Sequence, residues 1–268
     1  MKRVIGIHSL VNSVAIFFRR HSSFLASATF MIIFILVIVS GCSEDGAEAN
    51  LTGKGGSLAR FATSPTHLYA VDNEELHVYQ FMDGGAISRV NKVSLGPGVE
   101  TIAAMGDRLY IGTNEAMIIL DISSPSNPIL MSQHSHFVGC DPVVVQDTLA
   151  FVTLRTTSCR PSSVNILEVV DVKDVRQPLL VSSYALESPY GLGIDGDLLF
   201  VCEGENGLKV FNVTDPKNLQ LLKDYQDVDA YDVITKSGLL VLTGKNGIIQ
   251  YDYTDRNNIR KLSTIAIQ

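Results

Sequence analysis

The stretch YGLGIDGDLLFVCEGENGLKVFNVTDPKNLQLLKDY, residues 190–225, decides the fold of this chain. It contains four short runs rich in Val, Ile, Leu, Tyr and Phe: Tyr190–Ile194, Leu198–Cys202, Leu208–Val213 and Leu219–Tyr225. The residues between these runs, such as Asp195-Gly196 and Asp215-Pro216, favour tight turns. Short apolar runs separated by turn residues are typical of β-strands joined by hairpins. The stretch therefore predicts four consecutive antiparallel strands.

The same unit recurs five times along the chain. One leucine marks each copy, at positions 68, 109, 149, 199 and 239, which gives spacings of 41, 40, 50 and 40 residues. The longest spacing contains an insertion, Arg155–Asn165. A unit of about 40 residues with four strands is typical of a β-propeller blade. We therefore predict an all-β fold, a five-bladed β-propeller over residues 57–268 with each blade built from one continuous stretch: 57–97, 98–138, 139–187, 188–227 and 228–268.

The second half of the unit resembles a known repeat. An apolar strand that ends in Asp, as in Leu167–Asp171, recurs at Asp121 and Asp252, with Asn212 in the fourth copy and Gln80 in the first. This pattern resembles the LVIVD repeat of exported bacterial lipoproteins, and the similarity covers essentially all of residues 57–268. The resemblance implies a propeller and a location in the cell envelope. It implies no catalytic residue and no cofactor.

The N-terminal segment predicts export. Basic residues, among them Arg19 and Arg20, precede an uncharged stretch from Ser22 to Ser40, and the first acidic residue is Glu44. The junction Val39-Ser40-Gly41-Cys42 resembles the lipobox of bacterial lipoproteins, in which Cys42 would carry the lipid, such as palmitate. Residues 1–41 are then a signal peptide. An uncleaved transmembrane helix is the alternative, because about 20 apolar residues suffice to span a bilayer.

Residues 42–56 are polar, acidic and rich in glycine, which predicts a flexible tether. Acidic residues just after the lipidated Cys resemble the export signal of surface lipoproteins in Bacteroidetes. The expected location is therefore the cell envelope, as an outer-membrane lipoprotein, with the periplasmic or surface side left open. Removal of residues 1–41 leaves 21 − 4 = 17 basic and 28 acidic residues, a net charge of −11. Such a charge argues against a nucleic-acid partner.

Cysteines give one further prediction. Cys140 would lie at the start of an innermost strand, and Cys159 lies in the inserted loop that should return to the same face of the propeller. Exported compartments permit disulfides, so we predict a bond between Cys140 and Cys159. Cys202 lies in an apolar run and is predicted to be a buried core thiol.

The same topology predicts a ligand face. The starts of the innermost strands and the loops between second and third strands should meet at one mouth of the central channel. The candidate residues there are Glu100, Asp141, Arg155, Tyr190, Glu203, Glu205, Tyr231 and Asp232. We predict a binding or scaffolding module for a protein or small molecule at this face. The alternative is a hydrolase or lyase that uses Glu100, Asp141 and Asp232.

No cofactor or metal is predicted. Gly191–Gly196 matches G-x-G-x-x-G, but the match leads from a strand into a hairpin and not into the helix that a dinucleotide site requires.

Overall fold

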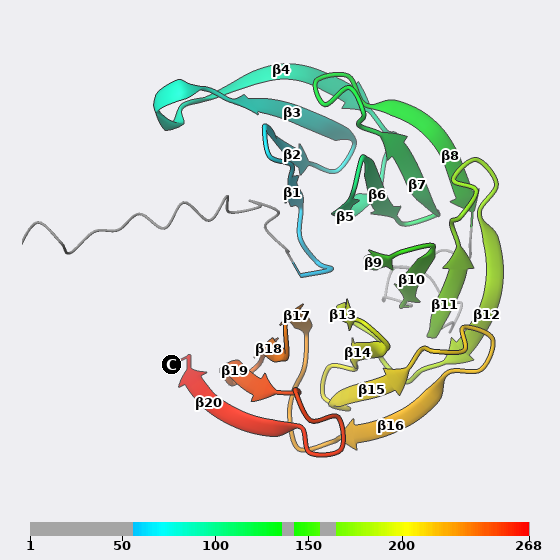
Figure 1. The fold of residues 1–268 in the computed structure, drawn as a ribbon, viewed down its shortest axis with the longest axis vertical. Coiled ribbons are helices and arrows are strands. Elements are labelled where there is room, and N and C mark those ends of the chain that lie inside the picture. The colour runs from blue at the N-terminus through cyan, green and yellow to red at the C-terminus, as the bar shows by residue number, and fades with distance from the viewer. Residues whose placement is uncertain (1–55, 136–141, 156–164, 268) are drawn as a thin grey trace, which may run out of the picture. The chain divides into compact units, whose positions relative to one another are not determined.

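The computed structural model describes residues 56–135, 142–155 and 165–267. These residues form twenty strands in five antiparallel sheets, and each sheet contains four consecutive strands (Figure 1). The predicted five-bladed β-propeller is therefore confirmed. Within the described residues, no helix is both long enough and apolar enough to cross a membrane. The predicted signal or anchor segment, residues 1–41, and nearly all of the tether lie outside the described residues.

The blades follow one another in chain order. The first contains β1 (Phe61–Thr63), β2 (His67–Val71), β3 (Glu75–Phe81) and β4 (Ile87–Ser94), with a short 3-10 turn at η1 (Asp83–Gly85). The second contains β5 (Val99–Met105), β6 (Arg108–Thr113), β7 (Ala116–Asp121) and β8 (Ile129–Ser135). The third contains β9 (Val143–Gln146), β10 (Leu149–Leu154), β11 (Ile166–Asp171) and β12 (Leu179–Ala185). The fourth contains β13 (Leu192–Asp195), β14 (Leu198–Cys202), β15 (Leu208–Asn212) and β16 (Gln220–Tyr225). The fifth contains β17 (Asp232–Lys236), β18 (Leu239–Gly244), β19 (Gly247–Asp252) and β20 (Arg260–Ala266).

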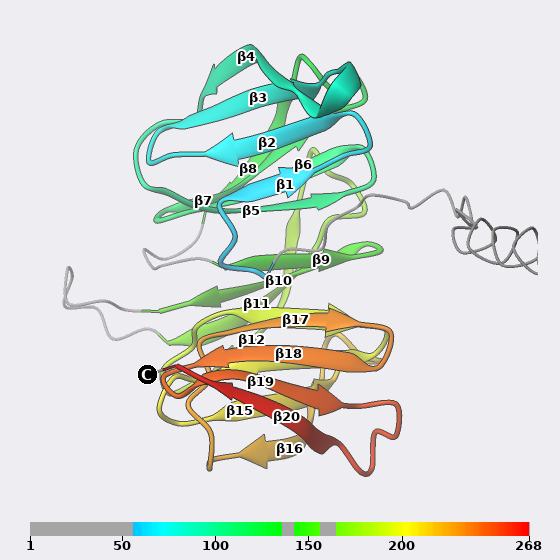
Figure 2. The ribbon, with the colours of Figure 1, turned by 90° about the vertical axis from the view of Figure 1, so that its left-hand side faces the viewer.

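The turns gather on two opposite faces of the ring of blades (Figure 2). We call the face where the innermost strands β1, β5, β9, β13 and β17 begin the top face, and the opposite one the bottom face. Because the strands of each blade are antiparallel, the turns between second and third strands return to the top face. The residues of the predicted ligand face that the structure describes therefore lie at the top end of their blades.

The Asp that ends the third strand has a structural role. The Oδ1 atom of Asp121 accepts a hydrogen bond from the backbone N–H of Ser123 at 2.7 Å, and that of Asp252 accepts one from Thr254 at 3.0 Å. A side-chain oxygen that binds the backbone two residues on stabilises a tight turn. Asn212 makes the same bond through its own Oδ1, to Thr214 at 2.9 Å. The replacement of Asp by Asn in the fourth repeat therefore preserves the turn.

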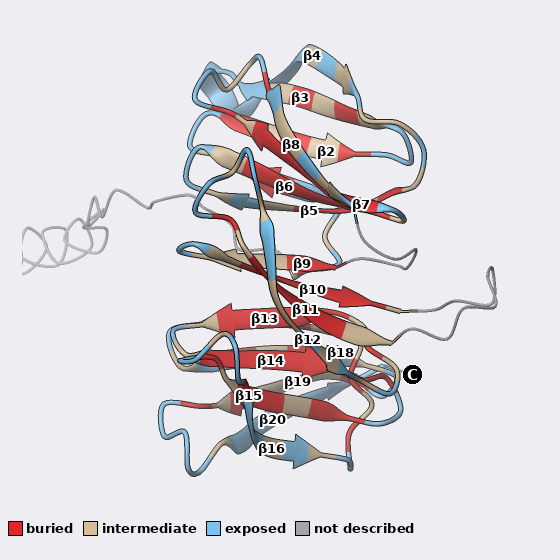
Figure 3. Cartoon of the chain, turned by 90° about the vertical axis from the view of Figure 1, so that its right-hand side faces the viewer, coloured by how far each residue is buried: buried red, intermediate tan, exposed pale blue. Residues whose placement is uncertain are grey.

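Four clusters of buried apolar side chains lie between adjacent blades, and in the described residues none joins the fifth blade to the first. In the second to fourth blades the second strand is buried on both faces, as all five residues of β14 show (Figure 3). In the first and fifth blades burial alternates along β2 and β18, so only one face of each sheet is covered. Figure 1 shows the first and fifth blades on either side of an opening in the ring.

Candidate functional site

Arg155, Tyr190 and Tyr231 come together on the top face. The guanidinium carbon of Arg155 lies 3.8 Å from the centre of the Tyr190 ring, and the rings of Tyr190 and Tyr231 are 5.2 Å apart with a tilt of 54°. The third, fourth and fifth blades each supply one of these half-buried side chains. A cation over an aromatic face is attracted by the negative charge of the ring face. The three residues form one surface with aromatic and cationic character.

The backbone holds this cluster in place. The hydroxyl of Thr153 donates to the carbonyl of Tyr190 at 2.7 Å, and the N–H of Tyr190 donates to the carbonyl of Cys202 at 2.8 Å. The N–H of Gly191 donates to the carbonyl of Tyr231 at 2.9 Å, so the fourth and fifth blades are joined directly beneath the two tyrosines. These bonds hold Tyr190 and Tyr231 just before the first residues of β13 and β17.

Asp232 anchors the segment that precedes the first blade. The Ser57 hydroxyl donates to Asp232 Oδ1 at 3.2 Å, and the same Ser57 oxygen accepts the backbone N–H of Leu192 at 2.7 Å. The backbone N–H of Val233 also donates to Asp232 Oδ1, at 3.0 Å. Burial raises the pKa of the Asp232 carboxyl group, and these hydrogen bonds oppose that rise. Asp232 and Ser57 therefore link the segment just before the first blade to the fourth and fifth blades.

Glu203 lies beneath the top face and not on it. Its side chain is 0% exposed. One oxygen accepts the backbone N–H groups of Glu187 and Ser188, both at 2.9 Å, and the other accepts from the Lys209 ammonium group at 3.2 Å. Buried carboxylates are stable only when they are paired in this way. Glu203 was predicted to lie on the ligand face, but the contacts that the structure describes for it are with the protein's own backbone and with Lys209.

The remaining predicted residues are dispersed. Glu100 is half-buried and lies at a register shift between Val99 and Thr101, where the bulged strand re-aims its side chain. Glu205 is exposed and lies 3.7 Å from the ammonium group of Lys245. Cys202 is a free, buried thiol, as expected.

Several predictions fall outside the described residues. They concern the lipidation of Cys42, the carboxylate Asp141, and the disulfide between Cys140 and Cys159. All three remain predictions.

A cavity of about 380 Å³ lies among the innermost strands. Its lining is mostly apolar and includes Phe61, Ala62, Ile102, Met105, Val143 and Ile194. The turn residues Ser64 and Gly106 also line it, so the cavity extends toward the bottom face. Cavities of roughly 300–1,000 Å³ accommodate small molecules. The alternation of residues along each strand did not reveal this space, because it depends on how far apart the innermost strands lie.

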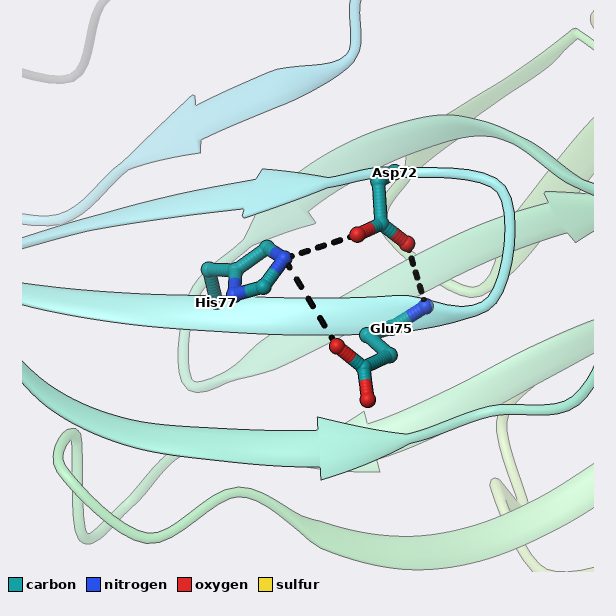
Figure 4. A group of neighbouring side chains, drawn as sticks. All are labelled: Asp72, Glu75 and His77. Carbon is teal, nitrogen blue, oxygen red and sulfur yellow. Dashed lines mark hydrogen bonds and ion pairs between the residues drawn. The ribbon is translucent and has the colours of Figure 1, made fainter.

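Asp72, Glu75 and His77 form a cluster that the sequence interpretation missed (Figure 4). The Nε2 atom of His77 lies 2.9 Å from Asp72 Oδ2 and 4.0 Å from Glu75 Oε2. The other Glu75 oxygen is 2.7 Å from the Lys92 ammonium group. Asp72 Oδ1 accepts the backbone N–H groups of Glu74 and Glu75, and the first of these bonds is the main reason that the Asp72 pKa falls to about 2. The cluster forms a hydrogen-bonded network at the turn between β2 and β3, and among the described residues the buried Nδ1 atom of His77 has no hydrogen-bond partner.

Comparison with known proteins supports the fold. Solved structures with similar folds include a protein from Lactobacillus plantarum (15% identity, TM-score 0.59, 76% of this chain and 69% of that chain). A periplasmic gluconolactonase from Pseudomonas aeruginosa has 12% identity and a TM-score of 0.57, over 75% of this chain and 68% of that one. Apo AztD from Citrobacter koseri has 13% identity and a TM-score of 0.56, over 77% of this chain and 61% of that one. At these identities the likeness shows the fold alone.

The family comparison concerns the second blade. Residues 98–135 match the model of the LVIVD repeat, and this range coincides with the sheet β5–β8. No curated protein matches the sequence. The repeat match and the five sheets together identify the chain as an LVIVD repeat-containing β-propeller.

Proposed function

We propose that the chain is a lipid-anchored, extracytoplasmic binding module that holds an organic anion at its top face. The observation that carries this proposal is the contiguous surface of Arg155, Tyr190 and Tyr231. Two tyrosine rings provide a face on which a planar or ring-shaped ligand can stack. A guanidinium group beside them can bind a carboxylate or phosphate through two parallel hydrogen bonds.

The carboxylates of the top face favour binding over hydrolysis. A glycosidase-like mechanism needs two carboxyl groups that are free to exchange protons with substrate. The Asp232 carboxylate accepts hydrogen bonds from the Ser57 hydroxyl and from backbone N–H groups. Glu203 is fully buried and paired with Lys209. The hydrolase or lyase alternative would have to rely on Glu100 and Asp141. We therefore do not extend the lactonase activity named for the Pseudomonas aeruginosa neighbour to this chain.

Ligand binding can be tested with a defined panel of probes. The purified chain is titrated with aromatic carboxylates and uronic acids, and binding is followed by calorimetry and by the shift of the thermal unfolding midpoint. We expect at least one probe to bind the wild type. Its affinity should fall at least tenfold in Arg155→Ala and in Tyr231→Ala, which corresponds to a loss of about 1.4 kcal/mol of binding free energy. Arg256→Ala, which removes an exposed arginine from the turn between β19 and β20 on the bottom face, serves as the matched control. Equal affinity in Arg155→Ala and wild type would sink the proposal.

Membrane anchoring is tested separately. The full-length chain and a Cys42→Ala variant are expressed with labelled palmitate, and protease access is measured on whole cells. We expect label on the wild type alone, with shaving of the wild type from intact cells if the propeller lies on the surface. Equal behaviour of both versions would favour an uncleaved transmembrane segment within residues 22–40.

A further inference from the structure

The apolar cavity among the innermost strands is separate from the candidate ligand surface on the top face. Gly56 and Ser57 form its top end, because the Ser57 hydroxyl oxygen accepts the backbone N–H of Leu192, the first residue of β13, at 2.7 Å. Ser64 and Gly106, in turns of the bottom face, line the other end. None of the aromatic or cationic side chains of the top-face surface lines the cavity. It is therefore a second space that a ligand can occupy.

Small side chains in the first two blades leave this space open. Ala62 on β1 and Ala103 and Ala104 on β5 line it, and each ends in a single methyl group. The innermost strands of the fourth and fifth blades, by contrast, are in close contact, because a Cβ added at Gly193 would lie 3.0 Å from Val233 Cγ2. The free space therefore lies beside the first three blades, whose innermost strands β1, β5 and β9 face the middle of the ring (Figure 1).

The lining of the cavity carries no charge. Among the described residues that line it, none is acidic or basic, and the polar side chains are the three hydroxyls of Ser57, Thr63 and Ser64. The Ser57 hydroxyl already donates to Asp232, and the Ser64 oxygen already accepts the backbone N–H of His67 at 3.1 Å. A charged group without a counterion is costly in an apolar space. The lining therefore favours an uncharged ligand over an ion.

The backbone supplies the groups that can orient such a ligand. As the innermost strands, β1, β5 and β9 each pair with only one strand of their own sheet. An edge strand presents backbone N–H and C=O groups to whatever lies beside it. A hydroxyl group on an otherwise apolar ligand can hydrogen-bond to these edges.

The size of the cavity limits the size of the ligand. Its volume is about 380 Å³. An apolar cavity of about 150 Å³ binds benzene, so this one has room for a molecule of roughly fifteen non-hydrogen atoms. Phe61 and Met105 add an aromatic ring and a flexible thioether to the lining, and both suit contact with a ring-shaped ligand.

We propose that this cavity is a second binding site, which takes one small, uncharged, mainly apolar molecule through the bottom face. The site goes beyond the proposed anion-binding function, because it uses another face of the propeller and other residues. Failure of one proposal leaves the other standing.

Two matched probes test the chemistry of the site. 1-Naphthol is uncharged at neutral pH, and 1-naphthoate has the same ring system with a carboxylate. Both are titrated into the full chain by calorimetry, in one detergent for every variant, so that the micelles take up the same share of probe. We expect one 1-naphthol per chain and a rise of the thermal unfolding midpoint, because a ligand of the folded state stabilises it. Any binding of 1-naphthoate should depend on Arg155 and not on the cavity.

Substitution of Ala104 tests the location of the site. Ala104 is exposed although it lines the cavity, so a larger side chain can extend into the space without displacing the core. Ala104→Trp fills the space and should lower the 1-naphthol affinity at least about tenfold, whereas Ala104→Ser and Arg155→Ala should change it less than about twofold. Val144→Phe, on β9, fills the same space from another wall and should act like Ala104→Trp.

The chain contains no Trp, so the new indole also reports its own surroundings. Its emission should lie at shorter wavelength in Ala104→Trp than in Leu221→Trp, at a 51% exposed position on β16. Thermal unfolding shows which variants remain folded. Absence of 1-naphthol binding to the wild type, undiminished affinity in a folded Ala104→Trp or Val144→Phe variant, or solvent-like emission from Ala104→Trp would each overturn the proposal. A loss of 1-naphthol binding in Arg155→Ala would place the probe on the top face and overturn it too.

Discussion

Replacement of Glu203 by Ala is expected to destabilise the propeller strongly, although the residue lies next to the candidate ligand surface. The change leaves the N–H groups of Glu187 and Ser188 without their acceptor and removes the nearer of the two carboxylates that pair with Lys209, whose side chain is only 13% exposed. Breaking one partner of a buried charge pair costs about 3–5 kcal/mol. For a domain of this size each kcal/mol lowers the unfolding midpoint by roughly 2–4 °C, so a loss of roughly 6–20 °C is expected.

Urea unfolding and calorimetry of purified variants measure this cost. Glu205→Ala is the control, because Glu205 is the same residue type two positions away, with a 78% exposed side chain. Its loose pair with Lys245 should contribute less than about 0.5 kcal/mol. Glu203→Gln keeps one carbonyl acceptor and should fall between the two. If Glu203→Ala unfolds within about 0.5 kcal/mol of the wild type, the structural role of Glu203 is refuted.

Three further predictions concern pH and backbone conformation. Burial raises the Asp232 pKa above its ordinary 3.8, so the folded state holds that proton more tightly, and stability is lost as the pH rises through the folded pKa. Urea unfolding should therefore show the wild type losing stability relative to Asp232→Asn between acidic and neutral pH; parallel curves would contradict this. Burial lowers the His67 pKa from 6.5, so stability is lost as the pH falls below that value, and His67→Gln should flatten the dependence of the unfolding midpoint. Gly207→Ala should cost more than about 2 kcal/mol, because φ is +97° and the new Cβ would lie 1.9 Å from the Tyr225 carbonyl oxygen. Gly196→Ala, at φ +59° in open space, should cost only about 1 kcal/mol in the same unfolding assay.

The blade count and strand order could be predicted because both depend on local patterns. In the second to fifth blades the turn after the third strand is fixed by one side-chain oxygen, as at Asp121 and Asn212, so its sequence signature repeats. Register was harder to predict. Leu149 pairs with Gln146, and Leu239 pairs with Lys236; both pairs lie directly next to the hairpin turn. Leu109 instead pairs with Ala104, one residue further from its turn. The leucines that align by sequence therefore do not all occupy the same structural position, and a shift of one residue reverses the face of the sheet.

The candidate site was predicted only as a set of residues on one face. Chain topology placed Arg155, Tyr190 and Tyr231 at the same end of their blades, but their contacts depend on the spacing of neighbouring blades. Burial of Glu203 could not be predicted, because the backbone N–H groups that donate to it belong to the connection between the third and fourth blades, 15 and 16 residues earlier in the chain. The Asp72–His77 contact was not predicted from the sequence, although residues that flank a tight hairpin are neighbours in space.

The sequence by itself determined the architecture: strand propensity, turn residues and a repeat of about 40 residues suffice for a propeller blade, because each blade folds from contiguous residues. Only the tertiary structure decided how the blades meet. Whether a carboxylate such as Asp232 is free or bound to Ser57 depends on contacts across 175 residues of chain. The uncovered faces of the first and fifth blades likewise follow from the arrangement of whole sheets, because burial depends on what stands opposite a side chain and not on its neighbours in sequence.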